Sequence, residues 1–113
     1  LFENRIPDIE LTTRQVIPLG LIINELATNT IQHGCSSEAE CRFGIEMARD
    51  PAGGYDLVVW NTGNPFPGDV ALEHPGTLGL RLITAMVKQL GGTIELERSP
   101  NTRFILHIPE ENE

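Results

Sequence analysis

The segment from Pro18 to His33 constrains the fold more than any other part of the chain, because it has the pattern of a helix with two different faces. Apolar side chains gather on one arc at about 100° per residue, and polar side chains gather on the opposite arc. The apolar arc holds Val16, Leu19, Ile23, Leu26 and Ala27, and the polar arc holds Glu25, Thr28, Asn29 and Gln32. Thr12 and Gln15 have the spacing of a capping box, and Pro18 is compatible with a first turn or a kink. We therefore expect a helix whose apolar face is buried and whose polar face is either solvated or part of a site.

The remaining pattern predicts one more helix and several strands. The expected elements are a strand end at 9–11, strands at 41–47 and 55–60, a helix at 77–90, and strands at 93–97 and 103–108. Residues 50–54 have the composition of a turn, so the two strands around them predict a hairpin. Gly91 and Gly92 close the second helix. The stretch 61–75 is long and irregular, and its glycines and prolines indicate a functional loop rather than a linker.

Length, charge and composition exclude several classes of protein. A chain of 113 residues with 40% hydrophobic residues corresponds to one domain with a core that needs no disulfides or metal. The net charge of −8 argues against a nucleic acid held by its phosphates. The single lysine, Lys88, is not in a GxxxxGK[ST] loop, which excludes the commonest nucleotide-binding fold. No apolar run is long enough to cross a bilayer, so we expect no membrane contact by this chain. The chain does not begin with Met, and we expect it to be a piece of a longer protein.

The cysteines and histidines are expected to be structural. Cys35 and Cys41 lie six positions apart, which fits neither a CxxC redox pair nor a recognisable disulfide framework. Reduced cysteines and a cytoplasmic setting are therefore expected. A zinc site formed with His33 is disfavoured, because the Cys-x₅-Cys spacing is too loose for structural zinc. His33, His74 and His107 are interpreted as structural residues rather than phosphoacceptors.

Three groups of residues can carry chemistry, and each has a simpler structural explanation. Glu25 and Asn29 are neighbours on one helix face, where a carboxylate can act on a nucleophile and an amide oxygen can bind Mg²⁺; otherwise they are solvated polar residues. The segment 60–63 follows an apolar strand, where side chains project into a cleft or form only a turn. The glycines of 76–80 let a phosphate approach the start of a helix, or they give only a flexible helix entry.

Taken in this order, the motifs resemble the ATP-binding domain of the GHKL superfamily, and within it the sensor histidine kinases. Residues 19–34 look like the N box of these kinases. Residues 61–67 stand where the DxGxG box belongs, and 76–83, followed by 89–92, look like the second glycine box and its helix. Residues 102–109 match the closing strand, so the resemblance covers nearly the whole chain.

The resemblance implies an α/β two-layer sandwich in which helices cover one face of a mixed sheet, with ATP held between the N-box helix and the loop after Asn61. It implies a single domain over 1–113, with an N box at about 19–34, an ATP lid at about 61–76 and a tail at 110–113. Asn29 is then the Mg²⁺ ligand, and Glu25 orients or activates the attacking group. The other nucleotide contacts implied are Asn61 and Thr102 with Gly63 at the adenine, and Gly76, Thr77, Leu78, Gly79 and Leu80 at the phosphates.

The resemblance also implies what the chain works with. The reaction is transfer of the γ-phosphoryl group of ATP to a histidine on a dimerisation domain outside this chain, and a response regulator is the further partner. The isolated domain is expected to be a cytoplasmic monomer. Two other functions share the fold: a serine kinase of the anti-sigma-factor type, and an interaction module that no longer binds ATP.

Four positions depart from the family pattern. Asn61 replaces the family's adenine-binding Asp, and Pro65 replaces the second glycine of that box. Gln32 stands where a basic residue is usual, and Asn101 stands where a glycine is usual. A neutral amide accepts the adenine amine without the help of a charge, so we expect weak ATP binding that Asn61→Asp tightens.

Overall fold

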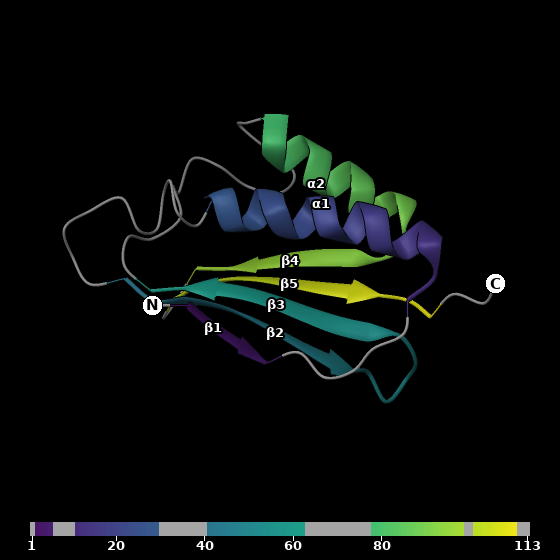
Figure 1. The fold of residues 1–113 in the computed structure, drawn as a ribbon, viewed down its shortest axis with the longest axis horizontal. Helices are drawn as coiled ribbons and strands as arrows, with labels where there is room; N and C mark the ends of the chain where they lie inside the picture. Colours follow the sequence, from purple (N-terminus) through teal and green to yellow (C-terminus); the bar gives the residue numbers. More distant parts are fainter. Residues whose placement is uncertain (1, 6–10, 30–40, 63–77, 99–100, 111–113) are drawn as a thin grey trace.

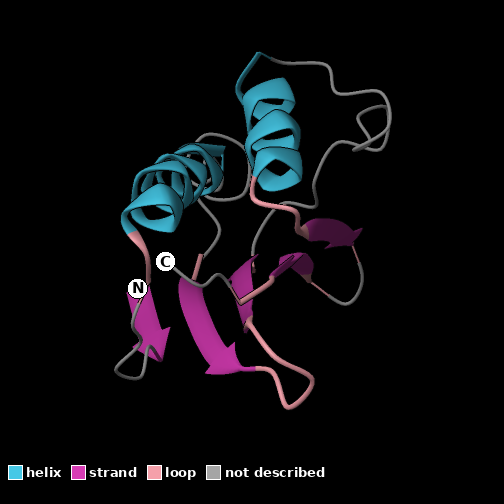
Figure 2. Cartoon of the chain, turned by 90° about the vertical axis from the view of Figure 1, so that its right-hand side faces the viewer, coloured by secondary structure: helices cyan, strands magenta, loops and turns pink. Residues whose placement is uncertain are grey.

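In the part of the chain that the structure describes, one sheet is covered on one face by two helices (Figure 1). A computed structural model describes residues 2–5, 11–29, 41–62, 78–98 and 101–110. The elements in chain order are β1 (Phe2–Arg5), α1 (Thr13–Asn29), β2 (Phe43–Arg49), β3 (Tyr55–Asn61), α2 (Leu78–Gln89), β4 (Thr93–Glu97) and β5 (Thr102–Ile108). Seen from the side, helices and strands form two separate layers (Figure 2). The two-layer α/β fold expected from the sequence is confirmed.

The sheet is mixed, and its strand order is β1-β2-β3-β5-β4. β1 pairs with β2 in parallel, and the other three pairs are antiparallel. The predicted hairpin is present, with residues 50–54 joining β2 to β3. In the central pair, β3 and β5 lie in register from Tyr55 opposite Ile108 to Asn61 opposite Thr102. This register matters for function because it places the end of β3 beside the start of β5.

The core lies between the sheet and the helices. Side chains of a strand point alternately to its two faces, and in β3 and β5 every second residue is buried. The buried apolar residues are Leu19, Ile22 and Leu26 of α1, Leu80, Ile83, Val87 and the following Leu90 of α2, Ile45 and Met47 of β2, Tyr55, Leu57 and Val59 of β3, and Phe104, Leu106 and Ile108 of β5. Asn61 and Thr102 continue the same alternation, so both lie on the helix-covered face.

α1 begins at Thr13, five residues before the expected start, and continues through Pro18. One bond of the expected capping box is seen directly: the Thr12 N–H donates to Oε1 of Gln15 at 3.2 Å. Nε2 of Gln15 donates to the Pro109 carbonyl at 3.0 Å, and Gln15 is only 2% exposed. These two bonds fix how the helix is rotated on the sheet.

The face of α1 that is buried differs from the expected one. The buried residues are Gln15, Leu19, Ile22 and Leu26, whereas Val16 is 50% exposed. At 100° per residue this face is rotated by about 60° from the predicted apolar arc. Asn29 then lies about 50° and Glu25 about 90° from the centre of the buried face, rather than opposite to it. Both residues are half-buried, and this placement brings them toward the sheet.

The N-terminal strand is also placed differently from the prediction. The strand is Phe2–Arg5, and Leu11 lies outside any strand, half-buried against the core. Of the expected strand end at 9–11, residues 9 and 10 lie outside the described part of the chain. Leu11 contributes to the core without belonging to the sheet, which explains the apolar residue in the sequence pattern. Among the described residues, no helix is both long enough and apolar enough to span a membrane.

α2 ends where the two glycines predict. The N–H of Gly91 donates to the Lys88 carbonyl at 2.9 Å, and the N–H of Gly92 donates to the Val87 carbonyl at 3.0 Å. Gly91 has a φ of 73°. This is a Schellman cap, in which a left-handed residue satisfies the last helical carbonyls. The tight reversal delivers the chain directly into β4.

We predict that alanine substitutions at Gly20, inside α1, and at Gly92, after the end of α2, have opposite effects on the free energy of unfolding. A Cβ at Gly92 would overlap the His107 backbone carbonyl, so Gly92→Ala should lower the free energy of unfolding by about 1 to 3 kcal/mol. Gly20→Ala, in the exposed middle of α1 with open space around it, should raise it by about 0.5 to 1 kcal/mol. Urea denaturation of both variants measures this, and a Gly92→Ala protein as stable as the natural one would contradict the close packing.

Candidate functional site

Three element ends lie together at one end of the molecule. The C-terminal end of α1, the end of β3 and the start of β5 all lie on the left side of Figure 1, whereas α2 begins above them, nearer the middle of the view. The three ends carry polar residues singled out in the sequence, and the start of α2 is a helix N-terminus on the same side of the sheet. The fold therefore brings the end of α1 and the β3–β5 edge, which are far apart in the sequence, to the same end of the molecule.

Asn61 and Thr102 form the floor of this region. They are direct cross-strand partners, and each is 3% exposed. Polar side chains at the edge of an apolar core are unusual unless they bind something or are bound by the protein. The expectation that both residues face the adenine is therefore compatible with their positions. The sequence spacing alone did not show that the two residues lie side by side.

The Asn61 side chain has a fixed orientation. Its Nδ2 donates to the Thr62 carbonyl at 2.8 Å, which leaves Oδ1 as an acceptor with no donor among the described residues. Thr62 is itself anchored, because its N–H donates to the Arg42 carbonyl at 2.8 Å and its Oγ1 accepts from the Arg42 N–H at 2.9 Å. Sequence analysis missed the part played by Thr62, and no local signal reveals it because the contact depends on strand register.

Glu25 and Asn29 project from the last turns of α1. Both side chains are half-buried, and neither side chain makes a hydrogen bond or ion pair with the described part of the chain. A carboxylate and an amide one turn apart, at the edge of the core and without protein partners, can serve as a base and as an oxygen ligand of a hard cation.

The start of α2 offers backbone donors. The first N–H groups of a helix have no partner within the helix and lie at the positive end of its dipole, so they favour phosphate oxygens. These groups belong to Leu78, Gly79 and Leu80. The Leu80 side chain is 1% exposed in the core, so this residue can offer a ligand only its backbone. Gly63, Gly76 and Thr77, and most of the expected lid at 61–76, lie outside the described residues.

Cys41 is disulfide-bonded, so the expectation of reduced cysteines is wrong for this residue. Cys35, the only other cysteine of the chain, lies outside the described residues, as do His33 and the end of the N box at 30–34. Two cysteines six positions apart match no recognisable disulfide framework, so their spacing did not predict a bond. A bonded Cys41 has no thiolate to give to zinc.

Comparisons with known proteins identify the family of this chain. Residues 15–112 match the family of histidine kinase-, DNA gyrase B- and HSP90-like ATPases. A blue-light-activated histidine kinase of Rhizobium johnstonii is 35% identical over 79% of this chain and 26% of its own length. A second such kinase, from Erythrobacter litoralis, is 37% identical over 79% of this chain and 24% of its own length. The chain thus spans about a quarter of these relatives.

The likeness extends to three-dimensional structure. The histidine kinase domain of a blue-light activated histidine kinase from Erythrobacter litoralis superposes with a TM-score of 0.88, covering 96% of this chain and 50% of that one at 22% identity. At this identity the superposition shows the fold alone. The chain belongs to the histidine kinase-, DNA gyrase B- and HSP90-like ATPase family, and its matched relatives in that family are histidine kinases.

We predict that Asn61→Asp has two opposite effects. Without nucleotide it should lower the melting temperature, because a buried carboxylate loses the bond to Thr62 and sets an oxygen against that carbonyl. With ATP it should tighten binding roughly fivefold, since a charged acceptor strengthens a hydrogen bond by about 1 kcal/mol. Thermal melts and ATP titrations measure the two effects.

Asn24→Asp is the matched control, because Asn24 is exposed on α1. It should change neither quantity appreciably. An Asn61→Asp protein that binds ATP no better than the natural one would contradict the role given to Oδ1 of Asn61.

Proposed function

We propose that this chain is the ATP-binding catalytic domain of a sensor histidine kinase, whose parent protein transfers the γ-phosphoryl group of ATP to a histidine outside this chain. The observation that supports this best is the position of the C-terminal end of α1 and of the β3–β5 edge at the same end of the fold, with the N-terminus of α2 on the same side of the sheet. Membership of the ATPase family and relatives that are histidine kinases support the same function. No finding favours the serine kinase or the inactive module.

The nucleotide is bound by groups of three kinds. Oδ1 of Asn61 accepts from the exocyclic amine of adenine, and Thr102 lies beside it across the strands. The N–H groups at the start of α2 bind phosphate oxygens. Asn29 offers its amide oxygen to Mg²⁺, which neutralises phosphate charge that this acidic chain does not neutralise itself.

Glu25 is the proposed catalytic residue. It stands one helical turn before Asn29 on the same side of α1, so its carboxylate lies near the metal-bound phosphates without being needed for ATP affinity. It orients the acceptor imidazole or takes its proton while the phosphoryl group is transferred. The acceptor belongs to a dimerisation domain elsewhere in the parent protein, and a response regulator receives the phosphoryl group from it. We place the isolated domain in the cytoplasm as a monomer, where its substrate ATP is available.

We predict that Asn29→Ala removes the dependence of ATP binding on magnesium. The natural chain should bind ATP more tightly with Mg²⁺ than with EDTA, and the variant should bind equally under both conditions because an oxygen ligand is lost. Asn24→Ala makes the same chemical change on the exposed side of α1 and should keep the full magnesium effect. Calorimetry decides, and equal ATP affinity of the natural chain with and without magnesium would sink the assignment.

We predict that Glu25→Gln spares ATP binding and slows phosphoryl transfer by about 10² to 10⁴-fold, the usual contribution of a general base. The assay uses the parent protein, which carries both this domain and the acceptor. Glu95→Gln, an exposed change on β4, is the control and should leave the rate unchanged. Loss of the label in acid distinguishes phosphohistidine from phosphoserine. A Glu25→Gln protein that transfers phosphate at the natural rate would contradict the assignment.

A further inference from the structure

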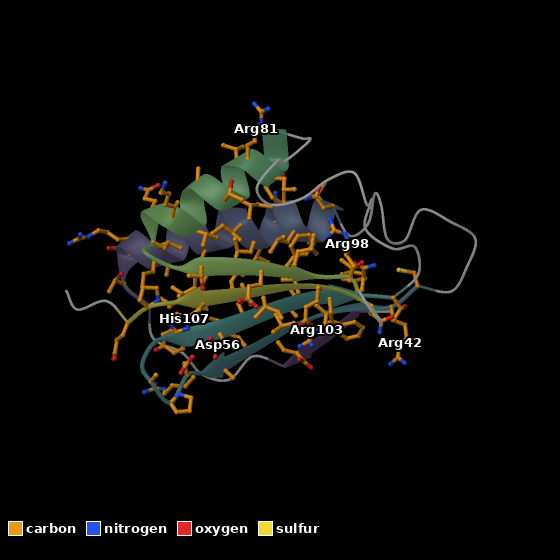
Figure 3. All side chains as sticks on the ribbon, turned by 180° about the vertical axis from the view of Figure 1, so that it is seen from behind. Arg42, Asp56, Arg81, Arg98, Arg103 and His107 are labelled. Atoms are coloured by element: carbon orange, nitrogen blue, oxygen red, sulfur yellow. The ribbon has the colours of Figure 1, made fainter. Side chains whose placement is uncertain are left out.

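Three side chains that can bind a metal converge at the end of the molecule opposite the nucleotide site. They are Asp50 of the β2–β3 turn, Asp56 of β3 and His107 of β5, and one ligand atom from each lies within 4.8 Å of the others. Asp56 and His107 are cross-strand partners on the sheet face away from the helices (Figure 3). Asp56 is five residues before Asn61, so the cluster lies about 17 Å along β3 from the adenine end.

One nitrogen faces two carboxylates in this cluster. Nδ1 of His107 lies 2.8 Å from Oδ1 of Asp56 and 3.3 Å from Oδ2 of Asp50. Nδ1 carries at most one hydrogen, whatever the protonation of the ring, so it cannot donate fully to both oxygens. Two carboxylate oxygens therefore compete for one ring nitrogen, an arrangement that a divalent cation would complete.

Asp50 is held in place for this role. Its Oδ1 accepts from the Ala52 N–H at 2.8 Å, and its backbone bonds with Gly53 and Gly54 close the turn. The bond from Ala52 is the main reason why the pKa of Asp50 lies below its usual value, with the nearby Asp56 and His107 lowering it further against the opposing effect of burial. Because Oδ1 is occupied within the turn, Oδ2 is the oxygen presented to His107.

We propose that Asp50, Asp56 and His107 form a binding site for one divalent transition-metal ion of the zinc type. In a tetrahedral site with bonds of about 2.0 to 2.1 Å, neighbouring ligand atoms are about 3.3 Å apart. The separations of 2.8 and 3.3 Å between Nδ1 of His107 and the two carboxylate oxygens lie close to this value, and all three ligand atoms lie within 4.8 Å of one another. All three side chains are partly exposed, which leaves an open position for water and a path for the ion.

The donor set selects the kind of metal. One imidazole nitrogen with two carboxylate oxygens suits Zn²⁺ or Co²⁺, whereas Mg²⁺ prefers oxygen ligands alone in an octahedral shell. The site is therefore distinct from the Mg²⁺ position proposed at Asn29. A bound ion joins the β2–β3 turn to the last strand, so it stabilises the fold rather than acting on the nucleotide.

The test is a titration of the full chain with Co²⁺, whose visible absorption reports nitrogen and oxygen ligation, followed by Zn²⁺ calorimetry without nucleotide. One equivalent should bind, with a rise in melting temperature. His107→Ala and Asp56→Asn should each weaken metal binding at least tenfold. Loss of a residue that only hydrogen-bonds to a metal ligand already costs about 10 to 100-fold, and these changes remove a ligand itself. His74→Ala, the same change at another histidine, should leave metal binding unchanged.

Both cluster variants lie on the exposed sheet face, and melts without metal verify that they are folded. The Co²⁺ spectrum provides a readout that a loss of stability alone cannot imitate. Absence of saturable binding by the natural chain would overturn the proposal. So would binding that His107→Ala and Asp56→Asn leave unchanged, because the metal would then be held elsewhere.

Discussion

The register between β3 and β5 is the constraint on which the rest of the structure depends. Seven residues of each strand pair in sequence, and alternate side chains on both strands enter the core beneath the helices. The same alternation carries Asn61 and Thr102 into that layer as opposite partners. A shift of either strand by one residue would turn its member of the pair to the other face and would expose its own core residues, Leu57 for β3 or Phe104 and Leu106 for β5. Burial of the core thus also positions the polar pair, so stability and function rest on one set of contacts.

The two proposed sites lie at opposite ends of the sheet and on opposite faces of it. The proposed nucleotide region lies on the helix-covered side, where half-buried polar groups and a helix N-terminus suit a large anionic ligand. The cluster of Asp50, Asp56 and His107 lies on the face away from the helices. β3 connects the two, with Asp56 near its start and Asn61 at its end.

Much of this could be predicted from the sequence because the signals were local. The hairpin turn, the strand β4 with its exact bounds and the glycine cap of α2 each follow from neighbouring residues. The rotation of α1 could not be predicted, because a bond from Gln15 to Pro109, 94 positions away, decides it. The order of the motifs was enough to propose the nucleotide site, whereas the pairing of Asn61 with Thr102 and of Asp56 with His107 became visible only from the strand register. The disulfide at Cys41 was missed for want of any spacing signal.

The central claim is that the nucleotide binds at the end of the fold that holds the C-terminal end of α1 and the β3–β5 edge, with the N-terminus of α2 toward its phosphates. Amide chemical shifts of the full chain, recorded by NMR with and without Mg²⁺ and a non-hydrolysable ATP analogue, test it most directly. The account predicts the largest changes at Glu25, Asn29, Asn61, Leu80 and Thr102, with little change at Asp50 and Asp56. Changes centred on the β2–β3 turn, or none at saturating nucleotide, would contradict it.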